Sequence, residues 1–308
     1  VSTRVERGAE KGSLHTYLDM YLDQSDLHAL GLVQDSIVNL RGTIQAELTG
    51  SGPDDVLGTV DLSEMSYNNG NNYYYIDRIH IASEQIDSLS RRLSVESEDL
   101  FSGHIQGNYL LSQVPAAVAN GLLSGFKAYR KKEVTPGQQY DFQFNITASN
   151  VKIVNTPLIF DGRTHFGGRV DTSGDDFSLE ILADRINYRD ILVDTLQMRL
   201  NTTLANVLTL QADKFINPVY SIEGLDFSAL RYADSLAIRS DFHKWNSADS
   251  IAFHLNAYQK DDAQGNIIVG FLPSRIDLEH LGWRFGSQGI PGRDRVVWNV
   301  NSGEVRID

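Results

Sequence analysis

The segment Tyr140-Asp-Phe-Gln-Phe-Asn-Ile146 decides the fold class, because every second residue is apolar and the residues between are polar. Successive side chains of a β-strand leave on opposite faces, so this pattern predicts a strand with one apolar and one polar face. The same alternation recurs at residues 44–48, 196–200 and 251–255. Continuous apolar runs, which are typical of sheets covered on both faces by helices, are scarce. The alternation therefore predicts a mainly β protein built on a long sheet that is apolar on one side.

Only two segments of the chain predict helices. A short helical turn is expected from Ser25 to Gly31, with Ser25 as the N-cap. A longer amphipathic helix is expected from Ser112, its N-cap, to about Lys131, before Pro136-Gly137. The apolar side chains that share one face of this longer helix are Val114, Val118, Leu122 and Phe126.

Turn residues separate the predicted strands at 50–55, at Asn69-Gly70 and at 261–265. Two parts of the chain also resemble each other in order: residues 93–107 resemble residues 208–224. We therefore expect a first β-repeat unit at 1–110 with a short N-terminal helical turn, and an amphipathic helix and linker at 111–137. A second β-repeat unit is expected at 138–230 and a third, truncated β unit at 231–308. Repeats that bury a face only against their neighbours indicate an elongated body. The alternative is one two-sheet sandwich with a duplicated half.

The charge and composition exclude several classes of function. The 308 residues contain 27 Lys and Arg against 40 Asp and Glu, which gives a formal net charge of -13. Such a surface repels phosphate backbones, so we expect no nucleic-acid partner. The absence of cysteine removes thiol catalysis and cysteine-ligated metal sites. No apolar run is long enough to span a membrane as a helix, and the chain stops within an alternating pattern. We expect it to be a piece of a longer protein, with any membrane anchor outside it.

Motifs that would carry catalysis or bind a cofactor are missing from the sequence. It contains no nucleophile elbow, no phosphate-binding glycine loop and no zinc-protease motif, so we expect neither an enzyme nor a cofactor. His80, His104 and His254 lie in the polar phase of their predicted strands and are interpreted as solvated surface. The segment from Asp171 to Glu180 resembles a calcium loop only weakly, and an acidic hairpin turn is favoured. Tyr73, Tyr74 and Tyr75 are interpreted as half-buried strand aromatics rather than a sugar-stacking platform.

Several segments resemble one family. Residues 41–52 with 57–62 are similar to the paired glycine-hydrophobic strands of the TamB family, which is related to AsmA-like proteins. Residues 93–100 with 103–109 resemble the recurring strand pair of that family. The pattern of a tryptophan before a short hairpin recurs between residues 271 and 299. Each motif is degenerate, so the resemblance depends on their number and order over nearly the whole chain.

The resemblance implies both a fold and a function. Members of the TamB family are periplasmic proteins of the Gram-negative cell envelope, held at the inner membrane by an N-terminal helix that this chain lacks. Their body is a strongly curved sheet, folded like a taco shell, with a hydrophobic inner groove. The implied function is to carry phospholipid between the inner and outer membranes in support of outer-membrane biogenesis, beside an outer-membrane barrel protein of the TamA type. The helix from Ser112 departs from the family pattern, and we expect it to cap or plug the groove.

Thirteen side chains are predicted to line the lipid groove. They are Ile44, Ala46, Leu48, Tyr140, Phe142, Phe144, Ile146, Leu196, Met198, Leu200, Ile251, Phe253 and Leu255. Acyl chains on such a surface leave water at about 0.8 kcal/mol per buried CH₂ and form no directional bonds, so they can slide. Two alternatives remain open. The same side chains would fill the dry core of a closed sandwich. The protein would otherwise be a scaffold that assists outer-membrane protein assembly or secretion by strand addition at a sheet edge.

Overall fold

The protein is mainly β, as the alternation predicts: 72% of it is strand, in one large antiparallel sheet that is not closed. The computed structural model describes residues 2–7, 14–26, 39–68, 73–98, 100–123, 129–148, 151–152, 157–174, 176–203, 207–232, 235–245, 250–262, 266–278, 281–286, 295–299 and 304–307. Within these residues the structure holds a single short α-helix. The chain forms two compact units. The N-terminal unit contains residues 1–116 and 134–147, and the C-terminal unit contains residues 117–133 and 148–308.

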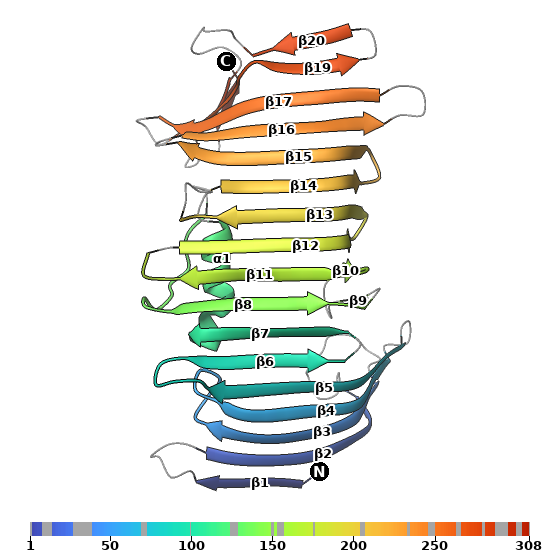
Figure 1. Ribbon diagram of the computed structural model, residues 1–308, viewed down its shortest axis with the longest axis vertical. Coiled ribbons are helices and arrows are strands. Elements are labelled where there is room, and N and C mark those ends of the chain that lie inside the picture. The colour runs from blue at the N-terminus through green and yellow to red at the C-terminus, as the bar shows by residue number, and fades with distance from the viewer. Residues whose placement is uncertain are drawn as a thin grey trace. The chain divides into compact units, whose positions relative to one another are not determined.

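The N-terminal unit is a meander in which each strand pairs antiparallel with the next along the chain, from β1 to β8 (Figure 1). Its elements are β1 (Ser2–Arg7), β2 (Leu14–Asp26), β3 (Asn39–Gly50), β4 (Leu57–Asn68), β5 (Tyr73–Gln85), β6 (Arg91–Ser97), β7 (Phe101–Asn108), the 3-10 helix η1 (Leu111–Gln113) and β8 (Gln139–Ile146). The predicted turn between β3 and β4 is confirmed. There the Asp55 carboxylate accepts hydrogen bonds from the backbone N–H groups of Ser51 (2.9 Å) and Gly52 (2.7 Å).

The C-terminal unit continues the antiparallel pattern from β11 to β17 and then divides. Strand β17 pairs with β18 at one end and with β19 at the other; β19 continues to β20, and β18 to β21 and β22. The strands are β9 (Val151–Lys152), β10 (Leu158–Phe160), β11 (Thr164–Asp171), β12 (Asp176–Tyr188), β13 (Ile191–Asn201), β14 (Val207–Ile216), β15 (Ser221–Tyr232), β16 (Ser235–Trp245), β17 (Ser250–Asp261), β18 (Ile267–Phe271), β19 (Ser274–Leu278), β20 (Leu281–Phe285), β21 (Arg295–Trp298) and β22 (Val305–Ile307).

The helix α1 (Val114–Leu123) is shorter than the sequence predicts. The predicted end near Lys131 is wrong, because residues 129–135 are not helical. The Asn120 side chain explains this: its Oδ1 accepts a hydrogen bond from Lys132 N, and its Nδ2 donates to Lys132 O, both at 2.8 Å. The chain after the helix is thus held in a non-helical segment beside it. Of the four predicted helix-face residues, Val114, Val118 and Leu122 lie in α1, and Phe126 lies outside the described residues.

Both predicted N-caps are wrong. Ser112 lies inside η1, and its N–H and hydroxyl donate to the Asp54 carboxylate at 2.8 and 2.7 Å, so a carboxylate from the β3–β4 turn takes the place of a local cap. Ser25 lies in β2, where it pairs with Leu40 of β3. The remainder of the predicted turn, residues 27–31, is outside the described part of the chain.

Candidate functional site

The strand register aligns the predicted groove residues of the N-terminal unit in cross-strand rows. Residues directly opposite each other in an antiparallel ladder point to the same face of the sheet. The longest row, called here the Phe144 row, takes one residue from each strand from β2 to β8: Leu18, Ala46, Val60, Ile81, Val95, Gly103 and Phe144. Parallel to it lie Ile44, opposite Leu62, and Phe142, opposite Ile105.

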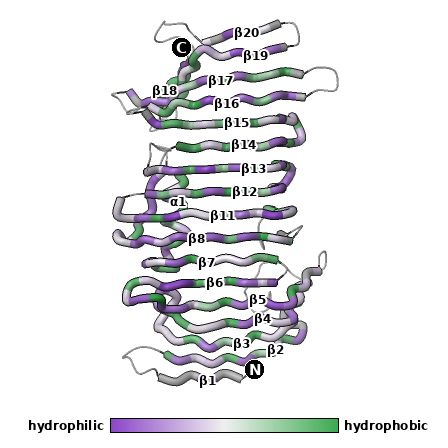
Figure 2. Tube along the Cα trace, in the orientation of Figure 1, coloured by the Kyte–Doolittle hydropathy of each residue, from purple (hydrophilic) through white to green (hydrophobic). Residues whose placement is uncertain are grey.

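The C-terminal unit has a row of the same kind. The Met198 row takes one residue from each strand from β11 to β17: Phe166, Ile181, Met198, Leu210, Phe227, Ser240 and Leu255. Beside it, Leu200 lies opposite Leu179 and Leu208. Further along, Phe253 stacks on Phe242 with ring centroids 4.6 Å apart. Hydrophilic and hydrophobic residues are interspersed along many of the coloured strands (Figure 2).

Most of the predicted groove residues keep some contact with solvent. Twelve of the thirteen are half-buried. The exception is Tyr140, which is 2% exposed and packs edge-on against Tyr109, with centroids 5.8 Å apart. Within the described part of the chain the Tyr140 hydroxyl has no hydrogen-bond partner, and burial raises its pKa to about 12. Tyr140 is therefore packed against its neighbours and, unlike the other twelve residues, is closed to solvent.

A buried arginine, Arg91, packs against Tyr109 in the same cluster. The alternation did not identify this residue. Arg91 is 8% exposed and follows the same phase of its strand as Leu93. Its Nη2 donates to the Tyr109 carbonyl at 2.9 Å, and its guanidinium lies 4.7 Å from the centroid of the Tyr109 ring. The cation–π contact with the Tyr109 ring stabilises the buried guanidinium of Arg91, at a position where an apolar side chain would be expected.

Helix α1 packs on the apolar side of β12. A Cβ atom placed on Gly121 would lie 2.2 Å from Cγ of Phe177, so the helix backbone rests directly on this ring. Phe177 is 2% exposed and shares its phase of β12 with Leu179 and Ile181 of the apolar rows. At this point the helix covers the side of the sheet that carries the predicted groove residues.

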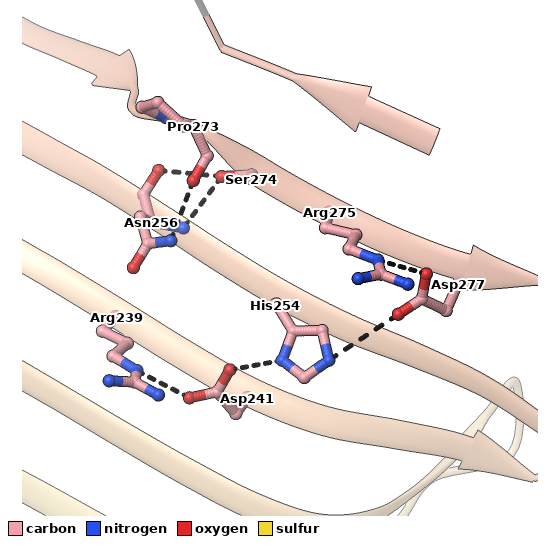
Figure 3. Close-up of polar contacts among 8 residues, drawn as sticks. All are labelled: Arg239, Asp241, His254, Asn256, Pro273, Ser274, Arg275 and Asp277. Atoms are coloured by element: carbon pink, nitrogen blue, oxygen red, sulfur yellow. Dashed lines mark hydrogen bonds and ion pairs between the residues drawn. The ribbon is translucent and has the colours of Figure 1, made fainter. Parts of the chain in front are cut away.

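The opposite phase of the strands carries ion pairs. In the C-terminal unit, Asp241 accepts hydrogen bonds from Arg239 Nε (2.7 Å) and lies 2.8 Å from Nδ1 of His254 (Figure 3). Nε2 of His254 is 3.9 Å from the Asp277 carboxylate, which also accepts a hydrogen bond from Nε of Arg275. Burial opposes ionisation of Asp241, but the hydrogen bonds from His254 and Arg239 outweigh it, and the net effect lowers the pKa of Asp241.

The N-terminal unit repeats this arrangement at Asp61. Arg78 Nη2 donates to the Asp61 carboxylate at 2.7 Å, and Nδ1 of His80 lies 3.0 Å from it. The hydrogen bond from Arg78 is the main reason that the pKa of Asp61 is below its ordinary value. All three histidines predicted to be solvated lie in the polar phase of their strands beside a carboxylate, but only His254 is exposed as predicted, because His80 and His104 are half-buried.

The lowered pKa of Asp61 predicts a loss of stability in acid. A carboxylate whose pKa is depressed on folding stabilises the folded state above its unfolded pKa, and this contribution disappears as the pH falls through the folded pKa. We expect Asp61→Asn to be less stable than the parent chain in urea at pH 7, and the difference to shrink as the pH falls below 3.8, the ordinary value for Asp. Arg78→Gln should reduce the same pH dependence. An equal difference at both ends of the pH range would contradict the assignment.

Two other predicted features have definite outcomes. The acidic hairpin turn is confirmed, since Asp171 and Asp176 face each other across β11 and β12 and the Asp171 carboxylate accepts from Ser173 N at 2.9 Å. The interpretation of Tyr73 and Tyr75 as half-buried is wrong, because they are 66% and 53% exposed near the start of β5. The side chain of Tyr74 is outside the described part of the structure.

No family model, curated protein or solved structure matches the chain. Among the described residues, no group of three or more His, Asp or Glu side chains is placed to hold a metal ion. The helical segments of the described chain are also too short or too polar to cross a membrane.

Proposed function

We propose that the apolar rows line a groove that carries phospholipid acyl chains between the inner and outer membranes of a Gram-negative cell. The protein would act in the periplasm, anchored to the inner membrane, beside an outer-membrane barrel protein of the TamA type, as its resemblance to the TamB family implies. The observation that carries the proposal is the combination of rows that are apolar except for Ser240 with retained solvent contact at twelve of the thirteen predicted residues. Side chains in a sealed core would have lost that contact.

The physical chemistry of such a surface suits transport. Acyl chains laid along the Phe144 and Met198 rows gain about 0.8 kcal/mol for each CH₂ removed from water. Apart from the hydroxyl of Ser240, the row residues have no polar side-chain group that would fix one position of the acyl chain, so the lipid slides at little cost. This function needs no catalytic group and no cofactor. Helix α1, resting on Phe177, would cap or plug the groove at β12.

A second function, a scaffold for strand addition in outer-membrane protein assembly, is supported by a different feature. The sheet is not closed, so it has two edges. An unpaired edge accepts an added strand through main-chain hydrogen bonds. This function depends on the edge backbone and not on the side chains of the rows.

Photo-crosslinking in cells separates these functions. A photoreactive phenylalanine is placed at position 144, in the Phe144 row, or at position 143. Position 143 is exposed and, with its cross-strand neighbour His104, lies on the other face of the sheet from Phe144. With labelled phospholipid and the full-length protein, we expect lipid adducts at 144 and none at 143. Folded protein without lipid at either position would contradict the groove and favour the scaffold. Adducts to outer-membrane proteins would support the scaffold further.

A further inference from the structure

The polar side of the N-terminal unit contains a hollow with a volume of about 490 Å³. Its wall consists of residues from strands β1 to β4: Arg4, Tyr17, Leu18, Asp19, Gln45, Ala46, Glu47, Thr59 and Asp61. Except for Leu18 and Ala46, which belong to the Phe144 row, these residues occupy the strand phase opposite to that row. The hollow is within the size range of small-molecule sites, and its wall combines polar and apolar surface in nearly equal parts.

The strand register arranges the wall as a grid. Tyr17 lies opposite Arg4 on one side and Glu47 on the other. In the next row, Gln45 lies opposite both Asp19 and Asp61. Neighbouring strands are about 4.8 Å apart and alternate residues along a strand are about 6.7 Å apart. The grid thus presents planar amide and carboxylate groups at regular intervals around one aromatic ring.

The aromatic ring of Tyr17 is held in place by a neighbouring side chain of the same strand, β2. The rings of His15 and Tyr17 are stacked, with centroids 4.7 Å apart and an interplanar angle of 13°. Nε2 of the same histidine is 3.4 Å from the Glu47 carboxylate. His15 therefore positions two components of the wall, and Tyr17 as a whole residue remains 36% exposed. A stacking surface that is ordered before binding loses less entropy when a ligand arrives.

The charges of the wall select a neutral ligand. Asp61 is already paired with Arg78 and His80, and Glu47 lies beside His15. Arg4 and Arg78 together offset two of the three carboxylates, so the wall keeps little net charge to attract an ion of either sign. What remains is a dense set of hydrogen-bond acceptors and donors around a flat ring. Such a set matches a molecule that has many hydroxyl groups and an apolar C–H face.

We propose that this hollow binds a neutral saccharide, with one sugar ring stacked on Tyr17 and its hydroxyls bonded to Asp19, Gln45 and Glu47. Asp19 and Glu47 accept hydrogen bonds from hydroxyls, and the Gln45 amide both donates and accepts. The stacked ring supplies the apolar contact, and the polar grid supplies orientation. This site lies on the side of the sheet opposite to the proposed lipid groove and does not depend on it.

The test is titration of the 308-residue chain with three neutral probes, chitotetraose, cellotetraose and maltotetraose, followed by calorimetry. We expect at least one probe to bind, with little dependence on salt. Tyr17→Ala should weaken that binding about tenfold, because the stacking contact is worth about 1.4 kcal/mol. Tyr17→Phe, which keeps the ring, should bind within about twofold of the parent. Gln45→Ala should also weaken saccharide binding. None of the three variants should change lipid crosslinking at position 144.

Tyr73→Ala is the matched control. Tyr73 is a more exposed tyrosine of the same unit and is not part of the hollow's wall. Its replacement should leave saccharide binding unchanged. An equal loss in Tyr73→Ala and Tyr17→Ala would overturn the proposal. So would the failure of all three probes to bind the folded parent chain, or salt-sensitive binding of spermidine in their place.

Discussion

Replacing Phe177 with alanine should lower the free energy of unfolding by about 3–5 kcal/mol, the cost of removing a fully buried aromatic side chain. The ring is 2% exposed and lies between the sheet and Gly121 of helix α1. Its removal leaves a cavity that the helix backbone cannot fill, because Gly121 has no side chain to move into it. Urea unfolding followed by circular dichroism would measure the loss.

Leu182→Ala is the control for this prediction. Leu182 belongs to the same strand, β12, but is 36% exposed and lies in the polar phase. Its truncation should cost well under half as much. Amide hydrogen exchange gives a second readout, since Phe177→Ala should increase exchange in residues 117–123 more than in β13. If the two variants were equally stable, helix α1 would not depend on Phe177 for its position.

The strands were predictable from the sequence because their signal is local. The alternation within one segment, such as 140–146 or 251–255, is enough to predict which of its side chains lie on the apolar face and which on the polar face. The turn at Ser51–Asp55 was predictable for the same reason. The predicted groove residues consequently fall into shared rows once the strands pair.

Features that depend on distant residues could not be predicted in this way. The hydroxyl of Ser112 bonds to Asp54, 58 residues earlier, so no local cap rule applies to it. The helix ends early because Asn120 holds Lys132, a contact that helical periodicity does not contain. The division at β17, where β18 and β19 share one strand, likewise has no sequence signature.

The polar hollow was missed for a related reason. Adjacency in the sequence makes Tyr73, Tyr74 and Tyr75 the evident candidates for a sugar-stacking platform. The wall of the hollow instead takes Tyr17, Gln45 and Asp61 from three different strands. The only available signal was that residues 15–19, 45–47 and 59–61 place polar side chains in the same strand phase. That signal becomes a site only after the register is known.

Replacing Met198 with aspartate should abolish phospholipid binding, whereas the same change at the adjacent Gln197 should leave it intact. Met198 is half-buried in the middle of its row, opposite Ile181 and Leu210. Gln197 is exposed on the other side of the sheet, opposite Leu182 and Gln211. An acyl chain that crosses the row would have to desolvate the new carboxylate without a partner, which costs several kcal/mol. We expect lipid recovered with the purified protein to fall more than about tenfold in the first variant.

The folding of the Met198→Asp variant decides between an open groove and a sealed core. On an open face the carboxylate stays hydrated, so the chain keeps its strand content and unfolds within about 1 kcal/mol of the Gln197→Asp control. In a closed sandwich the same carboxylate would be buried without a partner and the chain would not fold. A folded variant that still binds lipid would contradict the groove. Phe253→Asp repeats the test at the stacked pair of Phe253 and Phe242, which lies beside the Met198 row. Because the edge backbone is unchanged in all three variants, a strand-addition scaffold would lose nothing, and the two functions give opposite results.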